Sequence, residues 1–212
     1  MAADTQKAKP KSLKGRMSCG GSDCDNGLHC FRTSKKKGKE SKPAGSCQVC
    51  GKDQLVDWKQ VQSRDSKDIE NTVTALKNEW VRHQYWCVVN MSPKAIIHAR
   101  KKGLLGMREA AENRIRQSVG KAENFREGFQ TPWEGDRAVY YAQHATATCC
   151  RRCIENWHGI EFGRDLTQPE ISYLAQLVMR YIEEKIELTE QGEKPSEIRE
   201  KNPELFSSVK KG

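Results

Sequence analysis

Apolar side chains recur at helical spacing in the middle of this chain. Ile69, Val73, Leu76 and Trp80 follow one another at intervals of four, three and four residues. This spacing places all four on one face of a helix, and Ser66 stands where an N-cap would be. The pattern therefore predicts an amphipathic helix that packs its apolar face on a core.

Two further helices are predicted between residues 92 and 119. Ser92 followed by Pro93 is a strong helix start, with Ser as the cap and Pro in the first turn. This helix should run to about Lys102, because Gly103 interrupts the pattern. The second helix should cover about 106–119.

The strongest helix signal lies nearer the C-terminus. The sequence Thr-Gln-Pro-Glu at 167–170 is a capping box with Pro in the first turn. Ile171, Leu174, Val178 and Ile182 then recur on one helical face.

Several shorter segments complete the predicted elements. Short helices are expected at 55–62 and 150–157. The aromatic and β-branched segment 85–89 predicts either a strand or an extension of the preceding helix, and 138–143 predicts a short strand. The charged, proline-containing segment 191–212 is expected to be a flexible tail.

These elements predict a mainly α fold with a short strand element, that is, a small α+β protein. The helical domain should span 53–190, where nearly all patterned apolar residues lie. Residues 17–52 are rich in Cys, Gly and Lys but poor in aliphatic residues, so they should form a loop-rich module stabilised by zinc. Residues 1–16 should form a disordered basic arm.

The charge of the chain is concentrated at one end. The formal net charge is +9, and residues 1–52 alone hold 12 Lys and Arg against 4 acidic residues. Such a polarised field favours nucleic acid, DNA or RNA, as a partner, although solubility alone would also explain it. The candidate phosphate contacts are Lys35, Lys36, Lys37, Arg100, Lys101, Lys102 and Arg108, besides the lysines of the basic arm.

The nine cysteines bear on the compartment and on the chemistry. No apolar run reaches the ~20 residues of a membrane span, and the basic N-terminus has no apolar core of a secretion signal. We therefore expect a cytoplasmic protein, in which paired cysteines beside histidines bind metal rather than form disulfides.

The first cysteine cluster lies in the N-terminal module. Cys47 and Cys50, two residues apart and followed by Gly51, can hold one ion together. Two of Cys19, Cys24 and Cys30 should complete the site, with His29 as a further candidate. Thiolate ligands favour zinc or an iron–sulfur cluster, and the spacing does not match the common ferredoxin patterns.

The second cluster is denser and allows three interpretations. A structural zinc site would use His144, Cys150 and Cys153 with either Cys149 or His158. His158 lies ~140° from Cys153 on an ideal helix, so it can join the same ion only if the helix ends before it. Alternatively the cluster is catalytic, with His144, Cys149 and His158 as candidates for zinc- or cysteine-dependent chemistry. Buried thiols with hydrogen-bonded histidines would be the third interpretation.

This segment also resembles a known family. The shared motif consists of Gln-Thr-Pro at 130–132, Gln-His-Ala-Thr-Ala-Thr-Cys-Cys-Arg at 143–151, Cys153, and Trp-His-Gly-Ile at 157–160. It resembles the signature of the prokaryotic "domain of unknown function 4186" family, from about Ser92 to Leu188. The resemblance implies a bacterial or phage protein with a compact C-terminal domain, but no reaction. Short members that lack the N-terminal cysteines imply that the two clusters are independent sites.

A weaker resemblance is to the zinc-bound His-Asn-His nucleases of the ββα-metal type. There, Cys47 and Cys50 would pair with Cys150 and Cys153, although the long helical segment between them fits poorly. Three functions thus stay open. The first is a zinc-binding protein that binds nucleic acid. The second is a zinc- or cysteine-dependent enzyme acting on nucleic acid. The third is a thiol redox switch at Cys149 and Cys150.

Overall fold

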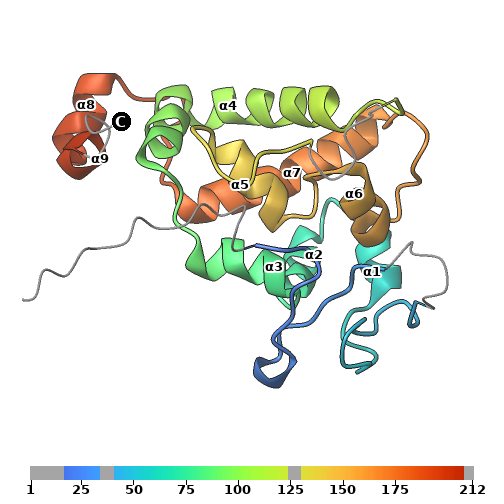
Figure 1. Cartoon of the computed structure of the whole chain (residues 1–212). Helices are drawn as coiled ribbons and strands as arrows, with labels where there is room; N and C mark the ends of the chain where they lie inside the picture. The colour runs from blue at the N-terminus through green and yellow to red at the C-terminus, as the bar shows by residue number, and fades with distance from the viewer. Residues whose placement is uncertain (1–16, 34–40, 124–129, 208–212) are drawn as a thin grey trace, which may run out of the picture.

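The protein is mainly helical (Figure 1). The structure, a computed structural model, describes residues 17–33, 41–123 and 130–207. In chain order its elements are the 3₁₀ helix η2 (Cys24–Asn26), α1 (Trp58–Gln62), α2 (Ile69–Leu76), α3 (Trp80–His83), the π-helix η3 (Gln84–Val88), α4 (Pro93–Ser118), α5 (Ala138–Ala145), α6 (Arg151–His158), α7 (Gln168–Lys185), α8 (Pro195–Lys201) and α9 (Pro203–Ser207). The basic arm and the lysines at 35–37 lie outside the described residues.

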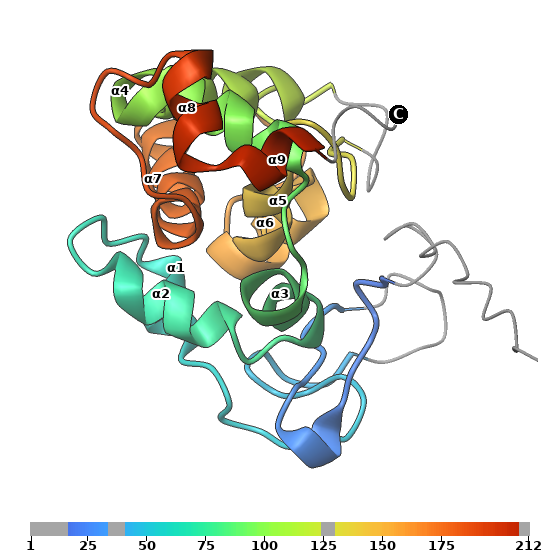
Figure 2. The same ribbon diagram turned by 90° about the vertical axis from the view of Figure 1, so that its left-hand side faces the viewer.

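The main core forms where α4, α5 and α7 pack on one another, with α5 and α7 below α4 in both views (Figures 1 and 2). From α4, Met107, Ala111 and Ile115 are fully buried. Leu174 and Val178 of α7 are also fully buried, which confirms the predicted apolar face of that helix. No helix within the described ranges combines the length and the apolar character needed to cross a membrane.

The predicted helix starts at Ser92 and Thr167 are confirmed. The Ser92 hydroxyl accepts a hydrogen bond from the Ala95 amide at 3.1 Å. At α7, the Thr167 hydroxyl accepts from the Glu170 amide at 3.4 Å, and the Glu170 carboxylate accepts from the Thr167 amide at 2.8 Å. Both caps satisfy amides that the first turn of a helix leaves without a partner.

The predicted interruption of α4 at Gly103 is also confirmed, and it fits a close approach of the chain after α7. Gly103 has φ 66° and ψ −176°, and a Cβ there would lie 2.1 Å from the Gly192 amide nitrogen. The Leu104 amide donates to the Thr189 carbonyl at 2.8 Å where the two segments meet. The segment expected to be a flexible tail begins here and includes α8 and α9, with Ile198 of α8 fully buried.

The strand predicted at 138–143 was wrong, because this segment lies in α5. Ala138, Tyr141, Ala142 and Ala145 are all buried against the core, and their spacing of three, one and three is helical. Packing thus overrides the strand propensity of the Val-Tyr-Tyr sequence. At 85–89, the alternative of a helix extension is the correct one, as η3. Pairing of β type in the described residues is limited to two isolated bridges.

The helix predicted from Ile69 to Trp80 is divided in two by the N-terminal module. α2 ends at Leu76, and Asp68 rather than Ser66 precedes its first turn. The His29 amide donates to the Asn78 carbonyl at 2.8 Å, and the Trp80 amide donates to the His29 carbonyl at 2.9 Å. These two bonds use backbone groups that a continuous helix would need, so α3 starts as a separate helix.

The N-terminal module packs below α1–α3 in both views (Figures 1 and 2). Its anchor is Phe31, which is 4% exposed and meets the rings of Trp58 and Trp157 edge-on at 5.9 and 5.7 Å. Trp157 lies on α6, which also carries Cys153 of the second cluster and has Cys150 as its N-cap. The module and the second cluster therefore share a small hydrophobic core of their own.

Candidate metal centres

Four potential ligands converge in the N-terminal module. The ligand atoms of Cys24, His29, Cys47 and Cys50 all lie within 4.8 Å of one another. We call this set the outer centre. Cys24, Cys47 and Cys50 were predicted as ligands, and the further candidate His29 takes the fourth place. Cys19 and Cys30, also predicted, do not belong to this group.

The distances in the outer centre match a tetrahedral zinc site. Zinc binds sulfur at ~2.3 Å and imidazole nitrogen at ~2.0–2.1 Å, so two sulfurs should lie ~3.8 Å apart, and sulfur and nitrogen ~3.6 Å apart. The Cys24 and Cys47 sulfurs are 3.7 Å apart, and the Cys50 sulfur is 3.6 Å from His29 Nδ1. One thiol pair and one mixed pair thus have the separations that the ion requires.

Two tight turns bring these ligands together. The first contains η2 and ends at Gly27 with φ 75°, so that Asp23 and Leu28 pair and Cys24 returns toward His29. The second turn is closed by the Gly51 amide, which donates to the Cys47 carbonyl at 3.0 Å. Neither turn belongs to an α-helix, so loop geometry places the three cysteines of the outer centre, while backbone bonds to Asn78 and Trp80 hold His29.

Backbone amides stabilise the thiolate form of Cys47. The amides of Val49 and Cys30 approach its sulfur at 3.4 and 3.5 Å. Burial raises the pKa of the Cys47 thiol, but these N–H groups and His29 outweigh it and lower the pKa to about 6. The thiolate, which is the form that binds metal, is therefore favoured before an ion arrives.

The second cluster gathers three buried thiols at the start of α6. The sulfurs of Cys149, Cys150 and Cys153 lie within 4.8 Å of one another. We call these three the inner thiol group. Cys150 is the N-cap of α6 and Cys153 lies in its first turn, as the Cys-x2-Cys spacing predicts. Hydrogen bonds, first from the Cys149 thiol and then from Cys150 and Cys19, hold the pKa of Cys153 well below its usual value.

A buried ion pair lies against the inner thiol group. Arg82, 1% exposed, approaches the Cys153 sulfur at 3.2 Å and the Cys149 sulfur at 4.0 Å. Its Nε donates to Glu79 at 2.9 Å, and the Trp157 indole donates to the same carboxylate oxygen at 2.8 Å. Sequence reasoning missed this pair; an Arg among Val81, Tyr85 and Trp86 was the available signal.

The other two predicted N-terminal ligands lie between the two centres. The side chain of Cys19 hydrogen-bonds to Cys153 of the inner thiol group. The Cys30 thiol donates to the Cys19 carbonyl at 3.7 Å, while the Cys30 amide faces the sulfur of Cys47. Burial raises the pKa of Cys30. A neutral, buried thiol is a poor metal ligand, so Cys30 is better suited to connect the two clusters through these hydrogen bonds.

The structure places the two histidines of the second cluster outside the inner thiol group. His144 is stacked between Trp133 and Tyr85, with ring centroids at 4.5 and 5.1 Å, and its Nε2 lies 3.1 Å from the Pro132 carbonyl. The Nε2 of His158 lies 3.0 Å from the carbonyl of Thr146. Each Nε2 must therefore carry a proton.

The burial of these groups bears on the catalytic interpretation. His158 is 0% exposed, and His144 and Cys149 are each 4% exposed. Burial lowers the pKa of both histidines to about 4, so both rings are neutral near pH 7. A substrate could reach these groups only if the surrounding helices opened, which favours a structural role for the cluster.

The comparison with known families decides the identity of this segment. A family model described as "Domain of unknown function (DUF4186)" matches residues 70–183, more than half of the chain. The protein belongs to the DUF4186 family. No solved structure matches the chain.

The DUF4186 segment contains the inner thiol group, the buried Arg82–Glu79 pair and both histidines. The outer centre and Cys19 lie outside it. The resemblance noted from the motif at 143–160 is thus confirmed at the level of the family. In this protein a cysteine-rich module precedes the family segment.

The predicted phosphate-contacting residues do not form one surface. Lys101 and Lys102 line a groove of about 580 Å³ together with Lys94 and His98 of the same helix. Arg100 is half-buried on another side of α4, where its carbonyl accepts from the Glu193 amide at 3.0 Å. Lys94 and His98 were not predicted, although their spacing of four residues places them on one face with Lys101 and Lys102.

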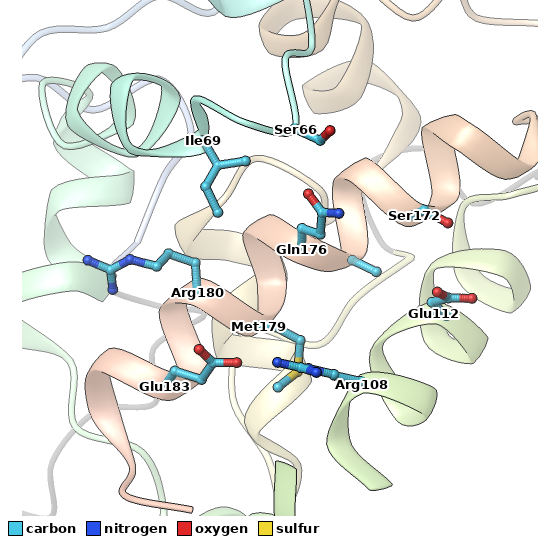
Figure 3. A pocket seen from close by; sticks show the side chains of 10 residues that line it. Ser66, Ile69, Arg108, Glu112, Ser172, Gln176, Met179, Arg180 and Glu183 are labelled. Carbon is cyan, nitrogen blue, oxygen red and sulfur yellow. The ribbon is translucent and has the colours of Figure 1, made fainter. Parts of the chain in front are cut away.

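Arg108 lines a different cavity, between α2, α4 and α7 (Figure 3). This cavity, also about 580 Å³, is lined by two arginines and two glutamates, which the close-up labels. Its lining includes neither cysteine nor histidine. The balanced charge of this lining gives no preference for an anion, and Arg108 lies apart from the groove that Lys101 and Lys102 line.

Proposed function

We propose that this DUF4186 protein is a zinc protein in which the metal has a structural role, and that it binds nucleic acid through the basic groove on α4. The pair of distances in the outer centre carries the proposal, because 3.7 Å between sulfurs and 3.6 Å between sulfur and nitrogen are the edges of a zinc tetrahedron.

The donor set supports zinc over other metals. Three thiols and one imidazole are soft and borderline ligands, which disfavour Mg²⁺ and Ca²⁺. Four protein ligands also fill the coordination sphere, as in structural zinc sites, whereas catalytic sites keep a position for water. The ion would therefore order the loops of the N-terminal module rather than perform a reaction.

The groove on α4 supports the binding of a polyanion. Lys94, Lys101 and Lys102 are exposed and lie on one face with His98. Phe206 of α9 also lines this groove and offers a ring on which a base could stack. Asp136 is the acidic residue in the lining, so the groove is positive overall.

Metal content tests the first part of the proposal. We expect the full chain, purified without chelator, to contain zinc by elemental analysis and native mass spectrometry. Cys47→Ser should lose the zinc ion of the outer centre, because it removes the fully buried ligand of that site. Cys87→Ser, which changes an exposed thiol outside both groups, serves as the matched control and should keep all zinc. A zinc-free protein that also fails to bind added zinc would contradict the proposal.

Salt-dependent binding tests the second part. Fluorescence anisotropy with labelled DNA and RNA should show binding at low salt that weakens as salt rises. Lys101→Glu with Lys102→Glu should weaken binding and reduce the salt slope by roughly two units, about 0.9 for each phosphate that the protein no longer neutralises. The control is Lys59→Glu with Lys67→Glu, which makes the same charge change at exposed positions away from the groove. Equal weakening in both double variants would contradict a role for the groove.

A further inference from the structure

We propose that Cys19 is the fourth ligand of a second zinc ion, bound together with Cys149, Cys150 and Cys153. The inner centre is then a four-thiolate site, built from three cysteines of the DUF4186 segment and one from the N-terminal module. This inference rests on the zinc-binding function proposed above, and it changes the predicted partner of Cys19 from the outer to the inner centre.

The hydrogen bonds of Cys153 carry the inference. The side chain of Cys153 hydrogen-bonds to those of Cys149, Cys150 and Cys19, so Cys19 meets the inner thiol group at Cys153. The Cys19 sulfur does not lie within 4.8 Å of all three other sulfurs, so ligation requires it to move closer to the group when the ion binds. Cys149, Cys150 and Cys153 by themselves supply three of the four ligands of a closed tetrahedral site. Cys19 is the thiol that reaches this group from another part of the chain.

The loop around Cys19 is held in place on both sides. The Gly21 amide donates to the Ser18 carbonyl at 3.1 Å, which closes a turn around Cys19. A Cβ at Gly21 would lie 2.5 Å from the Trp80 ring, so only glycine permits this close approach to α3. The thiol of Cys30 bonds to the Cys19 carbonyl from the other side.

The other candidates for the fourth position have different partners. His144 and His158 direct Nε2 to backbone carbonyls, and neither belongs to the inner thiol group. Cys30 directs its thiol to a carbonyl oxygen and its amide to the outer centre. Among these candidates in the described residues, Cys19 is the one whose side chain hydrogen-bonds to a member of the inner thiol group.

The buried Arg82 provides a counter-charge for this site. Four thiolates with one Zn²⁺ carry two net negative charges, which is costly in a buried position. The guanidinium approaches Cys153 at 3.2 Å and Cys149 at 4.0 Å, and it is oriented by Glu79. Such N–H groups, aimed at the ligand atoms from behind, orient and stabilise the ligands of many metal sites.

With Cys19 as a ligand, the inner zinc ion would have a structural role in joining two parts of the chain. It links the N-terminal module to α6 through a closed loop of more than a hundred residues, and closing so long a loop restricts the unfolded chain strongly. Folding of the module on the DUF4186 segment and metal binding at the inner centre then become one event.

Alkylation of the intact protein tests the assignment. The zinc-loaded full chain is treated with increasing chelator, the free thiols are alkylated, and each cysteine is quantified by peptide mass spectrometry. Cys87, which is exposed, should react at once and marks an unprotected thiol. Cys19 should become reactive over the same chelator range as Cys150 and Cys153. Reaction of Cys19 at the outset, together with Cys87, would overturn the assignment.

The variant Cys50→Ser separates the two centres, and its substitution is conservative because Cys50 is exposed. Removing this outer ligand should leave one zinc ion bound. The Cys24 thiol should then react with the alkylating reagent, while Cys19 stays protected. Reaction of Cys19 as fast as Cys24 would assign it to the outer centre and overturn the inference. In wild type, two zinc ions are expected.

Two serine variants then complete the test. Cys19→Ser should fall to one zinc ion with Cys24 and Cys50 still protected, whereas Cys30→Ser should keep both ions. Retention of two ions in Cys19→Ser would reject Cys19 as a ligand and leave the zinc function standing. Absence of zinc from the wild-type protein would reject the proposed function itself.

Discussion

The two clusters of candidate metal ligands in this protein lie in different surroundings. The outer centre is built from turns near the surface, and its Cys50 is exposed. The inner centre lies under α3 and at the start of α6, and Cys149, Cys150 and Cys153 are each no more than 5% exposed. The two sites therefore differ in how much water can stabilise their charge.

Each centre stabilises its thiolates by a different means. At the outer centre, two backbone amides point at Cys47, and one ligand is a neutral imidazole, so the net charge of the loaded site is small. At the inner centre, a full positive charge, Arg82, lies against the thiols. The comparison teaches that a charged donor lies against the buried thiols, whereas backbone amides and solvent serve the group nearer the surface.

The largest expected effect comes from removing that counter-charge. Arg82→Ala should cost about 3–5 kcal/mol in the free energy of unfolding, because it leaves Glu79 and the thiolates buried without their cation. Urea denaturation of the zinc-loaded protein measures it, and zinc content should fall at the inner centre alone. Arg180→Ala is the control: Arg180 pairs with Glu70 near the surface, so about 1 kcal/mol or less is expected. Equal destabilisation in the two variants would remove the distinction between the centres.

A smaller effect should follow from weakening the amide support of the outer centre. Val49→Pro removes the N–H that approaches the Cys47 sulfur at 3.4 Å. Removing a hydrogen bond to a metal ligand typically reduces metal affinity by about 10–100-fold. Zinc competition with a chromophoric chelator measures the change, and the inner ion should be retained.

The matched control at this position is Val49→Ala. Val49 is 54% exposed, so truncating its side chain alters little packing while it keeps the amide. If Val49→Ala weakens zinc binding as much as Val49→Pro, the side chain rather than the N–H supports the site.

The sequence predicted the ligand types of both centres better than it predicted their grouping. The Cys-x2-Cys spacing identified Cys47 with Cys50 and Cys150 with Cys153 because such pairs bind one ion through local geometry. The positions of His29 and Cys19 depend on how the module docks on α3, which no spacing encodes. Arg82 was missed for a related reason, since its hydrogen bonds to the His144 carbonyl and to Cys153 span 62 and 71 residues of sequence.

The helices show the same division between local and distant causes. Caps at Ser92 and Thr167 were predictable because each depends on residues three positions away. The strand expected at 138–143 failed because its aromatic and β-branched residues face a core that α4 and α7 supply. The predicted helix 69–80 was broken by pairing with His29, which belongs to the distant N-terminal module.

The smallest expected effect marks a site that belongs to neither centre. Glu170 closes the capping box of α7, and the Arg164 guanidinium, which binds it through two nitrogens, lowers its pKa to about 2. Glu170→Gln should therefore cost about 1–2 kcal/mol at neutral pH while the protein keeps its zinc. Urea denaturation and zinc analysis of the same samples test both halves of this prediction.

The stabilising contribution of Glu170 should depend on pH in a definite direction. Because the folded-state pKa of Glu170 lies below the unfolded value near 4.5, its contribution is present above pH ~4.5 and is lost as pH falls toward 2. The difference in stability between wild type and Glu170→Gln should shrink over that range. Glu184→Gln, on the same helix but in a half-exposed pair with Arg180, should cost no more than about 0.5 kcal/mol. If Glu170→Gln instead released zinc, the cap of α7 would be coupled to the inner centre, and the two centres would no longer account for all metal-dependent stability.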